Sequence, residues 1–275
     1  MKKTMQLKAR IKNLATKNNI PAQAVLQNLM LERLLERISF SDYKEKLILK
    51  GGMLVSSLVG IQSRTTMDMD TTLKDYRLSE SSVRQTLLDI CAIDLDDETI
   101  FTLKEISPIR DADEYGGYRV ALIAQYESII TPLKIDITAG DRITPDAVQY
   151  AFPSIFEEKL IHVWAYNIET ILAEKVETIF RRGIFNTRSR DFYDVYILLK
   201  TQKESFDKTL FKSALKATAQ QRLSLKALED KEEIINTIQS DELIRERWER
   251  YCKENYYAKG IEFDDVLKIV EEIIS

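Results

Sequence analysis

The stretch Leu47–Tyr76, LILKGGMLVSSLVGIQSRTTMDMDTTLKDY, decides the fold that this sequence predicts. It begins with the apolar run LIL, passes through Gly51-Gly52 into an apolar segment at Met53–Val59, and continues into the run MDMDTT at 67–72. Short apolar runs beside glycine are typical of buried strands, and the segment after the glycine pair is long and apolar enough for a helix. The expected local order is strand, glycine turn, helix and strand.

Two aspartates alternate in the second of these strands. Residues i and i+2 of a strand face the same side, about 6.5 Å apart, so Asp68 and Asp70 can present two carboxylates to one point while Met69 enters the core. Carboxylate oxygens hold divalent metals, and two Mg²⁺ ions can clamp the attacking and leaving oxygens of a nucleotidyl transfer. The alternative interpretation is an edge strand with a solvated polar face.

The glycine pair favours the metal interpretation. Gly51 and Gly52 let the backbone approach a phosphate closely, and the N–H groups at the start of the following helix can point toward it. A third carboxylate comes from LKIDIT at 133–138, where Asp136 shares one strand face with Lys134. Asp136 could complete a three-carboxylate site by lying on a neighbouring strand.

The rest of the chain predicts an α+β protein. Helical spacing of apolar residues at 21–38 indicates a helix ahead of the first strand, and long amphipathic segments dominate from about residue 168. Further strand-like stretches lie at 100–106, 117–126 and 133–138. We expect a mixed, largely antiparallel sheet flanked by helices over residues 1–160, and a helical bundle over 161–275.

Composition and charge exclude several classes of protein. The chain is 44% apolar and 31% charged, and no apolar run approaches the ~18 residues of a membrane span, so we expect no membrane association and a cytoplasmic protein. Cys91 and Cys252 lie far apart, which argues against a disulfide framework or a zinc site. His162 is the only histidine, which disfavours Ser-His-Asp hydrolysis. With a net charge of -4, any nucleic-acid contact must come from a local basic patch.

These motifs resemble those of a known enzyme superfamily. A glycine pair, a short helix, Asp-x-Asp on a strand and a later strand aspartate resemble the polymerase-beta-type nucleotidyltransferases. The segments ILKGGMLV, RTTMDMD, LKIDI, TILAEKVETIF and NTRSRDFYDVYIL, in this order, resemble the AbiEii/AbiGii toxin family of nucleotidyltransferases. These are toxins of a bacterial toxin–antitoxin type that is linked to abortive phage infection. The resemblance implies the nucleotidyltransferase fold and an NTP substrate.

The resemblance also implies roles for the residues of the opening stretch. The family's glycine motif falls on Gly51 and Gly52, with glycine where the wider superfamily often has serine, so the phosphate contact would come from the backbone. Its metal aspartates fall on Asp68, Asp70 and Asp136, which would hold Mg²⁺ or Mn²⁺.

Two further motifs fall in the helical part of the chain. The resemblance makes Lys175 a catalytic, nucleotide-binding residue that neutralises the triphosphate, and it makes Asp191 catalytic. The family commonly has lysine before this aspartate, where Arg190 stands here as a nucleotide-binding cation. The alternatives are that Lys175 only extends to solvent along its helix, and that Asp191 and Asp194 cap a helix together with Ser189. We expect the capping role for Asp194.

Two other segments carry weaker signals. Arg64, just before the Asp-x-Asp strand, can meet a triphosphate oxygen or pair with a nearby carboxylate. The segment Glu246–Lys259, ERWERYCKENYYAK, has the composition to stack on unpaired bases, although an amphipathic helix that packs its aromatics explains it equally well.

Together these patterns predict a Mg²⁺-dependent nucleotidyltransferase that moves NMP from an NTP to an acceptor hydroxyl. The resemblance implies that the acceptor is the 3′ end of tRNA, whose modification would inhibit translation. It also implies a type IV-like system with a cognate antitoxin, which a winged-helix protein acting without a stable complex would provide. The alternatives are nucleotidylation of a protein and a catalytically silent module that binds RNA or protein.

Overall fold

The computed structural model describes residues 2–109 and 116–275, which form two compact units. The first comprises Met1–Ser57, Arg64–Asp141 and Val148–Ala165. The second comprises Leu58–Ser63, Arg142–Ala147 and Tyr166–Ser275. The division into domains at 160/161, which the sequence favours, stays a prediction.

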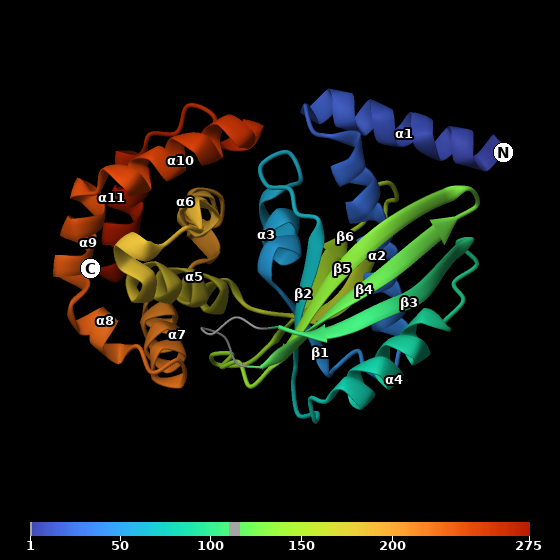
Figure 1. The fold of residues 1–275 in the computed structure, drawn as a ribbon, viewed down its shortest axis with the longest axis horizontal. Helices are drawn as coiled ribbons and strands as arrows, with labels where there is room; N and C mark the ends of the chain where they lie inside the picture. The colour runs from blue at the N-terminus through green and yellow to red at the C-terminus, as the bar shows by residue number, and fades with distance from the viewer. Residues whose placement is uncertain (1, 110–115) are drawn as a thin grey trace. The chain divides into compact units, whose positions relative to one another are not determined.

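A seven-stranded, mostly antiparallel sheet organises the first unit (Figure 1). Its strand order is β3-β4-β5-β2-β1-β7-β6, and the β2–β5 and β1–β7 pairs are parallel. The strands are β1 (Leu47–Lys50), β2 (Asp68–Leu73), β3 (Thr99–Pro108), β4 (Gly117–Tyr126), β5 (Ile129–Ala139), β6 (Val148–Pro153) and β7 (Leu160–Ala165). The neighbours of β2 in the sheet are β1 and β5, and no simple hairpin joins β2 to either of them. The centre of the sheet therefore joins segments that are distant in the chain.

Helices cover this sheet and supply much of its core. They are α1 (Lys2–Asn18), α2 (Ala22–Phe40), α3 (Gly51–Val59) and α4 (Glu80–Cys91). Helix α2 begins after Pro21, which suits a helix start, and its buried apolar stripe packs against β5 and β7. Helix α4 packs beside α2 and against β3, and its N-terminus is capped by Ser79.

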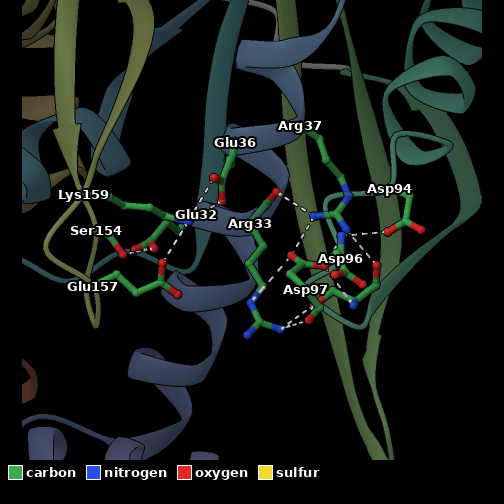
Figure 2. Close-up of polar contacts among 11 residues, drawn as sticks. Glu32, Arg33, Glu36, Arg37, Asp94, Asp96, Asp97, Ser154, Glu157 and Lys159 are labelled. Carbon is green, nitrogen blue, oxygen red and sulfur yellow. Dashed lines mark hydrogen bonds and ion pairs between the residues drawn. The ribbon is translucent and has the colours of Figure 1, made fainter.

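Charged side chains of α2 hold the helix to loops on its two sides (Figure 2). On one side, the fully buried Arg37 guanidinium lies 2.7 Å from an Asp97 carboxylate oxygen. On the other, Glu32 accepts hydrogen bonds from the Ser154 hydroxyl and the Ile155 N–H, at 2.5 and 2.7 Å. Burial raises the pKa of Glu32, and the two hydrogen bonds oppose this rise. These contacts fix the helix on which the central strands pack.

The second unit is largely helical, which confirms the expected α+β class with a C-terminal helical part. Its helices are α5 (Ile168–Arg182), α6 (Ser189–Thr201), α7 (Lys208–Gln221), α8 (Leu225–Glu229), α9 (Lys231–Ser240), α10 (Glu242–Glu254) and α11 (Phe263–Ile274). Helix α5 packs against α6 and α7. None of the helices in the described part of the chain is long and apolar enough to span a membrane.

Candidate active site

Four adjacent strands place one charged residue each in a row across the sheet. The β4–β5 register pairs Arg119 with Asp136, the β2–β5 register pairs Asp136 with Asp70, and the β1–β2 register pairs Asp70 with Lys50. Asp136 therefore lies on the strand next to Asp70, as expected. In this row the two carboxylates lie between an arginine and a lysine.

Alternation along the strands puts the carboxylates on the face opposite Met69 and Ile135. Met69 is fully buried between the half-buried Asp68 and Asp70, and Ile135 is buried beside the half-buried Asp136. This is the period of two that the strand geometry requires, because successive side chains point to opposite faces. One face of these strands therefore presents the carboxylates, and the other contributes apolar side chains to the core.

Basic side chains hold two of these three carboxylates. Arg119 donates from Nε and Nη2 to both oxygens of Asp136, at 2.9 and 2.7 Å, in a two-pronged pair. The hydrogen bond to Asp136 raises the pKa of the Arg119 guanidinium. The Lys134 ammonium lies 2.8 Å from an Asp68 oxygen, with both side chains more than a third exposed. The cluster is thus acidic but largely neutralised by its own strands.

The third carboxylate, Asp70, lies directly against the glycine turn. The Gly52 N–H donates to Asp70 Oδ2 at 3.2 Å, so one backbone donor expected for phosphate binds a carboxylate in this structure. Gly51 has φ +66°, in the left-handed region, and a Cβ added there would lie 2.1 Å from the same oxygen. Both the backbone angle and the close approach of Asp70 therefore demand glycine at 51.

Arg64 lies on the other side of this turn. A Cβ added at Gly52 would be 3.5 Å from Arg64 Nη2 and 2.8 Å from Thr66 Oγ1. Arg64 is buried, and its guanidinium donates to the Thr65 carbonyl oxygen, while the Ser56 hydroxyl donates to the Arg64 carbonyl. The structure thus places Arg64 beside the predicted phosphate site.

Sequence reasoning missed the role of Lys50, which directly precedes the glycine pair. Its ammonium lies 2.7 Å from Asp141 Oδ2, and the Thr138 hydroxyl donates to the same oxygen at 2.7 Å. Burial alone would raise the pKa of Asp141, but Lys50 and this hydrogen bond lower it well below its ordinary value. A lysine beside Gly51-Gly52 was the only signal in the sequence, and it does not identify Asp141 as the partner.

The donor set of the sheet fits a hard divalent cation in its chemistry. Asp68, Asp70 and Asp136 supply carboxylate oxygens from one face of two adjacent strands, and such oxygens are the ligands that Mg²⁺ prefers. Across residues 2–109 and 116–275, however, no three acidic, histidine or cysteine side chains converge as a metal-binding group. In this structure each of the three carboxylates has a different partner: Lys134 for Asp68, the Gly52 N–H for Asp70 and Arg119 for Asp136.

The second unit holds Lys175 and its two aspartates. The Lys175 ammonium on α5 donates to Asp191 Oδ1 at 2.8 Å and lies 3.0 Å from Asp194 Oδ2, with both aspartates on α6. Burial alone would lower the pKa of Lys175, but the two carboxylates raise it above its ordinary value. The interpretation that Lys175 extends to solvent is therefore wrong, because its charged end is enclosed by both carboxylates.

The surroundings of this lysine also change the interpretation of α6. Arg188 precedes α6 without a side-chain cap among the described residues, and Asp194 is fully buried one turn in, so the expected capping role for Asp194 is wrong. Asp191 Oδ2 is buried and has no hydrogen-bond partner in the part of the chain that the structure describes. Arg190 is exposed, and its charge opposes protonation of Lys175.

The aromatic segment 246–259 packs on itself and its neighbours. Trp248 is buried, donates from its indole N–H to the Ile261 carbonyl at 3.0 Å, and lies 5.7 Å from the Tyr251 ring. The ring centroids of Tyr257 and Tyr193 lie 4.9 Å apart. The packing interpretation therefore accounts for these aromatics.

The structure thus divides the predicted site residues into two groups. The first unit brings together Gly51, Gly52, Arg64, Asp68, Asp70 and Asp136. The second unit brings together Lys175, Arg190 and Asp191.

Comparisons with known proteins give one family match and several similar folds. Residues 33–269 match the family described as nucleotidyl transferase AbiEii toxin, of a type IV toxin–antitoxin system. Among solved structures, MenT4, a nucleotidyltransferase toxin from Mycobacterium tuberculosis, is similar with a TM-score of 0.57 and 14% identity, covering 97% of each chain. JHP933 from Helicobacter pylori is similar with a TM-score of 0.49 and 16% identity, covering 92% of this chain and 93% of its own. Among curated proteins, no sequence matches this chain.

Proposed function

Because this chain belongs to the AbiEii family of nucleotidyltransferase toxins, we propose that it transfers NMP from an NTP to the 3′ end of tRNA, in a Mg²⁺-dependent reaction that inhibits translation. One observation carries the proposal of an active site in the sheet. The carboxylate of Asp70 lies against the Gly51-Gly52 turn and next to Asp136 in register. The proposed metal ligands and the proposed phosphate-binding turn would thereby be adjacent, as transfer from a metal-bound triphosphate requires.

Asp68, Asp70 and Asp136 would hold Mg²⁺ or Mn²⁺. When bound, the ion supplies a Lewis acid that stabilises negative charge on the transferring phosphoryl group. The turn at Gly51-Gly52 opens α3, whose first N–H groups lack acceptors within the helix and can bind the β- and γ-phosphates. Arg64, beside Gly52, adds positive charge on that side.

The group around Lys175 would act on the substrates through Asp191 and Arg190. Lys175 holds Asp191 Oδ1, and a substrate hydroxyl would reach the buried Oδ2 only after a local rearrangement of the second unit. The exposed Arg190 offers a guanidinium for a phosphate oxygen. In this proposal Lys175 contributes mainly by orienting Asp191, and its charge adds to the field that favours the triphosphate.

The family also bears on the partners of this protein. A toxin of a toxin–antitoxin system implies a cognate antitoxin and, for a nucleotidyltransferase, a nucleotide substrate. We propose that the antitoxin is a winged-helix protein that acts without a stable complex, and that the toxin acts in the cytoplasm.

Label transfer tests this function directly. The purified chain is incubated with each α-labelled NTP, Mg²⁺ and either total RNA or a protein lysate, and Asp70→Asn serves as the inactive control. We expect label in the tRNA band for the wild type and none for Asp70→Asn. Label on a protein band would show that the acceptor is a protein and not tRNA. The absence of label in both fractions would contradict the proposal of an active enzyme. Omission of Mg²⁺ and Mn²⁺ should abolish transfer.

A further inference from the structure

Arg119 is a site residue that neither the sequence motifs nor the family assignment identifies. It lies on β4, opposite Asp136 in register, and its two hydrogen bonds occupy both oxygens of that carboxylate. Its side chain is 47% exposed, whereas Asp136 is 17% exposed. The guanidinium is therefore held on one side by the protein and open to solvent on the other.

Charge counting shows what this contact does. Asp68, Asp70 and Asp136 carry three negative charges, and Arg119 and Lys134 return two positive charges through the pairs with Asp136 and Asp68. A divalent cation carries the same two charges. Exchange of the two basic side chains for one such ion therefore leaves the net charge of the carboxylate cluster unchanged, so the field of the cluster does not oppose the exchange.

The freed side chains would then face a suitable new partner. A nucleoside triphosphate that arrives with the ion is strongly anionic, and the planar fork of an arginine binds two phosphate oxygens at once. The Arg119 side chain is nearly half exposed, so water can take over its hydrogen bonds as it leaves Asp136. The backbone of Arg119 is fixed on β4, directly opposite Asp136 on β5.

We infer that Arg119 is a polyphosphate-binding residue that holds Asp136 until the divalent cation binds and then moves to the triphosphate. This inference rests on the proposed function, since it concerns the nucleotide of that reaction. Arg119 competes with the cation for Asp136 and cooperates with it in nucleotide binding, so its removal must change the two affinities in opposite directions.

Binding measurements on the full chain test these two effects separately. Calorimetry with Mn²⁺ alone, in the absence of nucleotide, compares the wild type, Arg119→Ala and Arg119→Lys. We expect Arg119→Ala to bind Mn²⁺ about 2–5-fold more tightly, because Asp136 is no longer occupied. Titration of each of the four NTPs in the presence of Ca²⁺ should show affinity reduced about 10–100-fold for Arg119→Ala, and partly recovered by Arg119→Lys.

A matched control and the contrary results complete the test. Arg84→Ala removes another exposed arginine of the same unit, paired with Glu80 on α4, and should change neither affinity. Equal or weaker Mn²⁺ binding by Arg119→Ala would overturn the competition, and unchanged NTP affinity would overturn the transfer to phosphate. Melting curves confirm that each variant is folded. Mn²⁺ binding requires no acceptor, so the outcome of this binding test does not depend on whether the protein labels tRNA.

Discussion

Two lysine–aspartate contacts in this molecule have similar geometry and opposite surroundings. Lys134 and Asp68 lie 2.8 Å apart on the sheet, with 40% and 37% of their side chains exposed. Lys175 and Asp191 also lie 2.8 Å apart, with 16% and 4% exposed, and Asp194 adds a second, fully buried carboxylate. Water screens the first contact and is nearly excluded from the second. The first is suited to exchange partners with a substrate or an ion, and the second is suited to hold a fixed geometry.

The largest expected effect concerns activity on the sheet side. Asp70→Asn should reduce label transfer about 10³-fold or more, because it removes a charged metal ligand from the reaction centre. The amide can still accept from the Gly52 N–H, so the melting temperature should change little. Label-transfer rates and melting curves measure both effects. A variant that transfers at wild-type rates would remove Asp70 from the site.

The next effect concerns stability in the second unit. Lys175→Met should destabilise the protein by about 3–5 kcal/mol, because it removes a cation that two buried carboxylates contact. Lys134→Met, on the exposed pair, should cost no more than about 1 kcal/mol. Urea unfolding at pH 7 compares the two variants. Equal costs would mean that burial does not distinguish the two contacts.

A rescue variant sharpens this comparison. Addition of Asp191→Asn and Asp194→Asn to Lys175→Met removes the uncompensated charges and should recover much of the lost stability, while label transfer stays low if Asp191 acts on the substrates. Recovery of transfer together with stability would assign all three residues a purely structural role.

A smaller effect is expected at the glycine turn. Gly51→Ala and Gly140→Ala both place a side chain at positive φ, which costs about 1–2 kcal/mol. Only at Gly51 does the new Cβ meet another atom, Asp70 Oδ2, since the space around Gly140 is open to 4 Å among the described residues. Gly51→Ala should therefore lose label transfer while Gly140→Ala keeps it. Similar transfer by both variants would show that Asp70 can move without consequence.

The smallest effect is a pH dependence of the Lys50–Asp141 pair. The folded pKa of Asp141 lies below its unfolded value of 3.8, so the unfolded chain binds the proton first as the pH falls. The pair's contribution to the free energy of unfolding is complete well above this value and declines below it, by about 1.4 kcal/mol per pH unit at most. Urea unfolding from pH 6 to pH 3 compares the wild type with Asp141→Asn. The difference between their free energies of unfolding should decrease below pH 4. A constant gap would contradict this account.

Local pattern was sufficient for the strands that carry the sheet site. The alternation around Asp68 and Asp70 has a period of two, and the glycine pair marks the turn, so both could be identified from neighbouring residues. That Asp136 joins them required the resemblance or the structure. Periodicity reveals which face of a strand is polar, but it does not reveal which strands are neighbours.

Contacts between distant segments explain what the sequence did not predict. Arg119 and Lys50 become site residues only through the register of β4 with β5 and of β1 with β2. On α5, Lys175 stands among apolar residues, a pattern that fits a solvent-directed lysine as well as a buried one. Only the packing of α6 against α5 shows that two aspartates meet its charge. Helical spacing describes one helix and says nothing of its partner.

The parallel pairing of β2 with β5 has a consequence for the order in which the toxin is made. Thr71 and Asp136, neighbours across this pair, are 65 residues apart in the chain. When Asp68 and Asp70 have been synthesised, the ribosome has therefore still to synthesise β5, the strand that carries the third carboxylate. Strand pairing over such a separation in the chain is also slow to form. A nascent or prematurely terminated chain that ends before β5 lacks the complete cluster, so the cell that makes this toxin is not exposed to its chemistry until most of the first unit has been translated.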